Sequence, residues 1–163
     1  MNRRIIITML IGLILLGQST SVWAVQGKLK EALASYEAQE YSSALAHFVT
    51  LAEEGSSEAQ YHVGRMYLLG QGVGKDLKIS ASWYQKAANQ GNAKAQNDLG
   101  VMYLRGIGVP QDYKKGFEWI GQAANAGLID AQFSMGLLYA EGKGVRKNLQ
   151  QAASWFEQAA KQG

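Results

Sequence analysis

The stretch that decides the fold is AKAQNDLGVMYLRGIGV, residues 93–109. A shift of 36 residues toward the N-terminus reaches SEAQYHVGRMYLLGQGV at 57–73, and the same shift forward reaches IDAQFSMGLLYAEGKGV at 129–145. An Ala-Gln pair, an internal glycine, a tyrosine and two closely spaced glycines recur at the same places. A fixed period of this length is typical of a protein built from stacked repeats.

Each unit reads as a helix, a glycine loop and a second helix, because apolar residues recur at helical spacing on both sides of the loop. We expect the first helix of the first unit at about 58–69, ended by the glycines of the loop 70–76. Asp76, Asp112 and Asn148 stand where the N-cap of each second helix belongs.

The residues ahead of the first unit predict a shorter helix pair, with Leu29, Ala32, Leu33 and Tyr36 as the apolar face of its first helix. Only a few residues near Gln39 join its two helices. The predicted organisation is therefore a divergent N-terminal capping pair at 25–55, followed by repeats at 56–91, 92–127 and 128–163.

The first 24 residues predict a cleavable secretory signal peptide. Arg3 and Arg4 precede the apolar run 5–16, and Val22 and Ala24 occupy the small-residue positions before the cleavage site. An uncleaved membrane anchor is the alternative, but the run falls short of the roughly 20 apolar residues that span a bilayer. We therefore expect a periplasmic or secreted protein without a stable membrane anchor.

Composition excludes several classes of protein. Removing 1–24 takes away two arginines and no acid, so the formal net charge falls from +3 to +1. A nearly neutral mature chain lacks the basic footprint of a nucleic-acid-binding protein. The chain has no cysteine, so neither disulfides nor a lipid-modified cysteine can hold or anchor it.

Residue patterns for chemistry are absent from the sequence. His47 and His62 are the only histidines and have no cysteine partners, which argues against a metal site. The loop 70–76 resembles a phosphate-binding loop only superficially, because its spacing and hydroxyl residue are missing. No nucleophile elbow occurs. We predict no catalytic residues, no metal and no cofactor.

Two sets of recurring residues are interpreted as structural. Gly64, Gly100 and Gly136 lie inside predicted helices, where glycine costs about 1 kcal/mol relative to alanine. We infer that a neighbouring backbone or ring rests against each one. The regular placement of the tryptophans favours a core role over a stacking platform for bases or sugars; they are Trp83, Trp119 and Trp155.

The pattern Ala-x-Ala-Gln-x-x-Leu-Gly-x-Met-Tyr-x-x-Gly-x-Gly-Val at 93–109, with Trp119 and the Ala123-Ala124 pair, resembles the Sel-one-like repeat family. The resemblance covers 56–163 fully and 27–55 loosely. It implies a tetratricopeptide-like, all-α, right-handed α-solenoid used for protein–protein interaction. Exported bacterial members are associated with envelope signalling, host contact and neutralisation of antibacterial effectors. Cysteine-rich relatives are linked to β-lactam binding or hydrolysis, but this chain lacks their cysteines.

The copies also differ from one another, and these variable positions trace one side of each first helix. First helices commonly line the concave side of such solenoids, so we predict a partner-binding groove there. The alternative is a solvated face whose variation carries no function. The nominated residues are Glu58, Tyr61, His62, Arg65, Lys94, Asn97, Asp98, Val101, Arg105, Asp130, Phe133, Ser134 and Leu137.

The last repeat has no polar capping helix in this sequence, and solenoids usually need one. Leu138 and Trp155 are therefore expected to be partly exposed, for self-association or for a partner. The leading hypothesis is a non-enzymatic exported interaction module, an adapter, regulator or inhibitor. Narrower or competing hypotheses are an immunity protein against a periplasm-acting effector, a β-lactam-binding or -hydrolysing enzyme, and a structural envelope protein.

Overall fold

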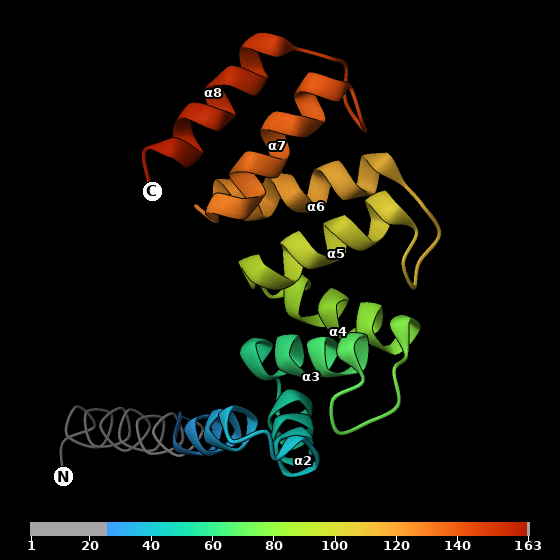
Figure 1. The fold of residues 1–163 in the computed structure, drawn as a ribbon, viewed down its shortest axis with the longest axis vertical. Helices are drawn as coiled ribbons and strands as arrows, with labels where there is room; N and C mark the ends of the chain where they lie inside the picture. The colour runs from blue at the N-terminus through green and yellow to red at the C-terminus, as the bar shows by residue number, and fades with distance from the viewer. Residues whose placement is uncertain (1–25, 163) are drawn as a thin grey trace, which may run out of the picture.

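The chain is a stack of helical hairpins. In the computed structural model, which describes residues 26–162, the helices follow one another into an arc (Figure 1). Residues 26–37 are helical and precede α2. The remaining helices are α2 (Tyr41–Glu53), α3 (Ser57–Leu69), α4 (Leu77–Asn89), α5 (Ala93–Arg105), α6 (Tyr113–Asn125), α7 (Ile129–Glu141) and α8 (Leu149–Ala160). This all-α solenoid is the predicted fold, and the described part of the chain contains no strand. The predicted signal peptide at 1–24 lies outside the described residues.

Helix ends follow the chemistry that the sequence predicts. The carboxylates of Asp76 and Asp112 accept hydrogen bonds from the first-turn N–H groups of α4 and α6, and the Asn148 side chain does the same for α8. These N-caps satisfy donors that a helix start leaves free. Gly70 ends α3 in the left-handed region, at φ 73°, where a side chain would be strained.

The core forms three successive clusters, and each joins a second helix to the first helix of the next unit. Phe48 of α2 packs with Val63 of α3 in the first cluster. Tyr84 of α4 packs with Leu99 of α5 in the second. The third cluster repeats this arrangement between α6 and α7. Stability therefore comes from contacts between neighbouring units, as in other solenoids.

Inside each unit the two helices touch at the recurring helical glycine. A Cβ on Gly100 would lie 2.5 Å from Ile120 Cγ1 and 3.0 Å from the Gly116 carbonyl oxygen. Gly64 meets Tyr84 in the same way, and Gly136 meets Phe156. The close approach inferred from the sequence is thus present, and its partner is always the residue 20 positions downstream.

The prediction that the tryptophans are core residues needs correction. Trp83, Trp119 and Trp155 are half-buried and flank the clusters instead of filling them. The residue that follows Trp83 and Trp119 in each unit, Tyr84 or Ile120, is the fully buried one. The indole is exposed on one side, where Lys86 Nζ lies 3.9 Å from the ring centroid of Trp83.

This placement lowers the expected effect of removing an indole. Truncating a fully buried aromatic residue costs about 3–5 kcal/mol, and the cost falls with the area that is buried. We expect Trp119→Ala to lower the free energy of unfolding by about 2 kcal/mol. Urea denaturation followed by circular dichroism measures this change. A loss as large as that of a fully buried aromatic would contradict the half-buried placement.

Candidate partner-binding groove

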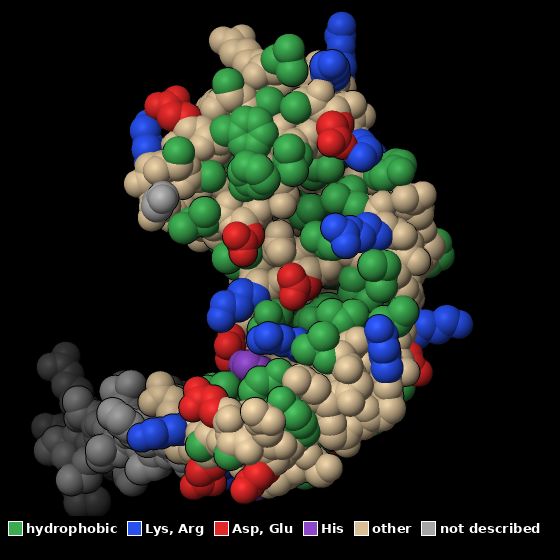
Figure 2. Space-filling model, viewed as in Figure 1, with side chains coloured by type: hydrophobic (Ala, Val, Ile, Leu, Met, Phe, Trp, Pro, Cys, Tyr) green, Lys and Arg blue, Asp and Glu red, His purple; other side chains and the backbone are tan. Residues whose placement is uncertain are grey.

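The predicted groove residues come from the three first helices α3, α5 and α7. Figure 2 shows charged side chains of both signs around the hollowed side of the arc, and hydrophobic side chains gathered over α7 and α8. Arg65, Lys94, Arg105 and Asp130 are exposed. Phe133 and Leu137 of α7 are also exposed, at 52% and 42%. The half-buried members of the set are Glu58, Asn97, Asp98, Val101 and Ser134.

Two predicted groove residues are instead part of the interior. Tyr61 and His62 are only 8% and 9% exposed. The His62 ring stacks on Phe48 with centroids 4.6 Å apart and an interplanar angle of 5°. Tyr61 stacks on Tyr84 at 5.7 Å. Both aromatic side chains thus bridge neighbouring helices and are not free to meet a partner.

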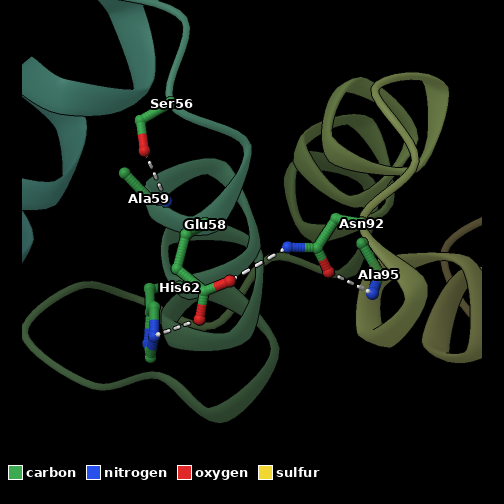
Figure 3. Close-up of polar contacts among 6 residues, drawn as sticks. All are labelled: Ser56, Glu58, Ala59, His62, Asn92 and Ala95. Carbon is green, nitrogen blue, oxygen red and sulfur yellow. Dashed lines mark hydrogen bonds and ion pairs between the residues drawn. The ribbon is translucent and has the colours of Figure 1, made fainter. Parts of the chain in front are cut away.

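The N-terminal half of the surface is polar and internally bonded. Glu58 Oε1 lies 3.6 Å from His62 Nε2, and the other carboxylate oxygen accepts a hydrogen bond from Asn92 Nδ2 at 3.1 Å (Figure 3). Asn92 also caps α5 by accepting from the N–H of Ala95 at 3.0 Å. Glu58 therefore connects α3 to the start of α5. Its role in this half is to hold two units together.

Burial shifts the proton affinities of the groups in this half. Desolvation raises the pKa of Asp98, while the hydrogen bond from Asn97 and the charge of Arg65 partly oppose the rise. Desolvation lowers the pKa of His62. The neighbouring Glu58 carboxylate opposes that decrease. These shifts follow from enclosure between repeats and do not indicate catalysis, because structural clusters perturb pKa values too.

The C-terminal half contains an apolar hollow. A space of about 290 Å³ lies between α5 and α7, bordered by Val101, Leu137 and Ser134, with Arg105 and Glu141 at its polar edge. Apolar side chains surrounded by charges of both signs are typical of a protein interface. Of the predicted set, these residues are the ones that the fold brings together around a free space.

A second hollow of about 670 Å³ lies between α7 and α8 and contains Asp130, Phe133 and Ser134 of the predicted set. Ile129 and Phe156 line it as well, although sequence reasoning did not nominate them. Ile129 stands where the other units have Ser57 and Ala93, which was the available signal. Phe156 follows a tryptophan, in the position that is fully buried elsewhere.

The expected exposure at the last repeat is partly wrong. Leu138 is buried, at 4% exposed, because it packs into the third core cluster. Trp155 is half-buried, as expected. The exposed apolar residues of this region are Ile129, Phe133, Leu137 and Leu149.

The family profile described as Sel1 repeat matches residues 57–92, 93–128 and 129–163, more than half of the chain. The chain belongs to the Sel1 repeat family. Sel1 repeats are protein-interaction modules. No curated protein matches this chain.

Two solved structures share both sequence and fold with this Sel1 repeat chain. The Sel1 repeat protein from Oxalobacter formigenes is 36% identical with a TM-score of 0.78, over 82% of this chain and 55% of that one. The protein c5321, a protective antigen of uropathogenic Escherichia coli strains with an SLR fold, is 35% identical with a TM-score of 0.82. That match covers 93% of this chain and 33% of c5321, so this chain spans between a third and about half of these relatives.

A more distant likeness is to the immunity protein Pa5087 from Pseudomonas aeruginosa. It is 21% identical with a TM-score of 0.60, over 85% of this chain and 53% of that one. At this identity the comparison shows a common fold and nothing further.

The Sel1 repeats were also inspected for metal and membrane features. Among the described residues, no group of three or more His, Asp or Glu side chains is placed to hold a metal ion. Over the same part of the chain, no helix combines the length and the apolar character needed to cross a membrane.

The lowered pKa of His62 predicts how stability depends on pH. Below 6.5, the ordinary value for histidine, the unfolded chain takes up a proton that buried His62 resists. Stability should therefore fall as pH decreases from 6.5 to the lower pKa of His62 in the fold, and this loss should end below it. Glu58 favours the charged ring, whereas Arg65 and Lys94 disfavour it.

His62→Gln should remove this part of the pH dependence. Urea unfolding of both proteins at several pH values gives the difference between their stability curves. Asp98 has a raised pKa and acts in the opposite direction at lower pH, but it is present in both proteins and cancels. Parallel curves between pH 6.5 and 5 would contradict the placement of His62.

Proposed function

We propose that this protein is an exported, non-enzymatic adapter or inhibitor that binds a protein partner between α5 and α7. The observation that carries the proposal is the apolar hollow in which Leu137, 42% exposed, lies with Val101 and Arg105. A large apolar residue left exposed in a hollow with an arginine beside it is the usual composition of an interface anchor. Membership of a family of interaction modules supports the same function.

The partner is tested by affinity capture in the native host. The bait is the tagged chain, compared with an Arg105→Ala/Leu137→Ala variant that keeps native helicity. The matched control is Ile79→Ala/Lys114→Ala, which removes an exposed aliphatic residue and a charge from second helices α4 and α6. We expect a partner captured by the wild type and the control, and lost with the groove variant.

Reconstitution then measures the effect. With the captured partner purified, calorimetry should show affinity weakened by about 10–100-fold in the groove variant and unchanged in the control. Equal affinity for all three proteins would place the binding surface elsewhere. Turnover of a chromogenic β-lactam by the purified protein would instead favour the enzyme hypothesis.

Export is part of the proposal and has its own test. Cell fractionation and N-terminal sequencing of the mature protein should place it outside the cytoplasm, with Val25 as its first residue. A cytoplasmic protein that retains Met1 would overturn the exported role and leave the binding proposal standing.

A further inference from the structure

The fold repeats one contact that α8 alone does not make. Phe48, Tyr84 and Ile120 occupy equivalent positions on α2, α4 and α6, and each is 0% exposed because the next first helix covers it. Phe156 holds the same position on α8, yet it is only half-buried. A hollow of about 670 Å³ lies beside it.

A polar contact marks the same junction. In each unit, the glutamine of the first helix donates from Nε2 to the carbonyl oxygen of an alanine at the end of the preceding second helix. The pairs are Gln60–Ala52 at 3.0 Å, Gln96–Ala88 at 3.2 Å and Gln132–Ala124 at 3.3 Å. The alanines of these pairs are at most 2% exposed. The equivalent residue on α8, Ala160, is exposed, and the described residues supply no glutamine to its carbonyl.

A third contact comes from the glycine loops. The second glycine of each loop lies so close to the first residue of an earlier second helix that a Cβ would overlap that residue's carbonyl oxygen. The pairs are Gly72 with Tyr41, Gly108 with Leu77 and Gly144 with Tyr113. On α8 the equivalent first residue is Leu149, and it is 65% exposed.

The three contacts together describe what fits α8. Leu149, Ala153, Phe156 and Ala160 recur at spacings of four and three residues, so they form one stripe along the helix. On the other second helices the same stripe is covered by a helix with Ala-Gln, an apolar residue three positions later and a glycine next to it. The occupant is thereby defined by its chemistry as an amphipathic helix of this pattern.

A second copy of this chain does not offer such a helix. Its α3, α5 and α7 already lie between second helices of their own chain. The helical residues 26–37 have a first helix's place with one side free, but Lys28, Lys30 and Glu31 are exposed there. Charged side chains do not match an apolar stripe.

We propose that the stripe Leu149, Ala153, Phe156 and Ala160 of α8 is a docking surface for a Sel1-type helical hairpin of another polypeptide. The incoming first helix covers Phe156, its glutamine bonds the Ala160 carbonyl, and its glycine loop rests on the start of α8. This surface is separate from the hollow that contains Val101, Arg105 and Leu137. The inference therefore does not depend on the proposed function of that hollow.

The probe for this surface is a fluorescein-labelled peptide of residues 92–127, the helix–loop–helix that carries Gln96 and Gly108. Its binding to the purified full chain is followed by fluorescence anisotropy. The test variant is Leu149→Lys/Ala160→Lys, two exposed positions on the stripe. The matched control, Ser154→Lys/Gln158→Lys, adds the same charges to exposed positions on the other side of α8.

We expect saturable binding to the wild type, to the control and to the Arg105→Ala/Leu137→Ala groove variant, and binding at least 10-fold weaker to the stripe variant. A peptide with Gln96→Ala and Leu99→Asp should bind as weakly as the stripe variant does. Absence of binding to the wild type, or equal binding to the stripe variant, overturns the proposal. Sedimentation equilibrium of the chain alone completes the test, because a dimer abolished by the stripe variant would make a second copy the occupant.

Discussion

Replacing Gly100 with leucine is expected to abolish the folded structure of the helical stack. A Cβ at this position would lie 2.5 Å from Ile120 Cγ1 and 3.0 Å from the Gly116 carbonyl oxygen, so three further carbons have no space. Ile120 is fully buried and the Gly116 oxygen belongs to the backbone of α6, so neither can move without separating the helices. The cost, about 5 kcal/mol or more, is comparable with the whole stability of a small domain.

Circular dichroism and urea unfolding measure this effect. The control is Gly121→Ala, a helical glycine in α6 whose added Cβ would make only ordinary contacts, 3.6 Å from the Met135 methyl carbon. Alanine there should be neutral or should stabilise the protein by about 1 kcal/mol. A helical Gly100→Leu protein that unfolds cooperatively near the wild-type midpoint would refute the close approach of α5 and α6.

The repeat period made much of this architecture predictable. A shift of 36 residues superimposes the helices, the loops and the N-cap residues, and the structure has all of them where the sequence places them. The same comparison also pointed to Gly100 as a contact position. It did not point to Gly116, although its equivalents Ala44, Ser80 and Ala152 are all small, because small size alone is a weak signal.

The period was less informative about exposure. Tyr61 varies between copies, and variation was interpreted as freedom to bind a partner. In the structure it is buried against Tyr84, whereas Phe133 at the equivalent place is 52% exposed. The difference arises because the next unit covers Tyr61 and no described unit covers Phe133. Burial in a stack depends on the neighbouring unit, which the residue types of one unit do not specify.

The same reasoning separates two origins of the apolar surface on α7. Leu137 lies beside Val101 of the preceding first helix, so its exposure belongs to the groove inside the stack. Phe133 lies beside Phe156, with ring centroids 5.3 Å apart, so its exposure belongs to the uncovered side of the last unit. For that reason the groove variant leaves Phe133 intact, and the two proposed surfaces can fail independently.

Replacing Gly108 with alanine is expected to be the second most damaging change. Gly108 lies in the loop between α5 and α6 at φ 70°, and a Cβ would overlap the Leu77 carbonyl oxygen at the start of α4. The left-handed backbone costs alanine about 1 kcal/mol, and the clash with a rigid helix start adds about 1–3 kcal/mol, for a total of about 3 kcal/mol. The control is Gly127→Ala, which has φ 90° and no atom within 4 Å of the added Cβ, so it carries the backbone strain alone. Urea unfolding of the two variants should differ by about 2 kcal/mol, and this difference measures how tightly each loop locks its unit onto the one before. Equal losses in the two variants would mean that the loop rests on α4 too loosely to set the spacing of the stack.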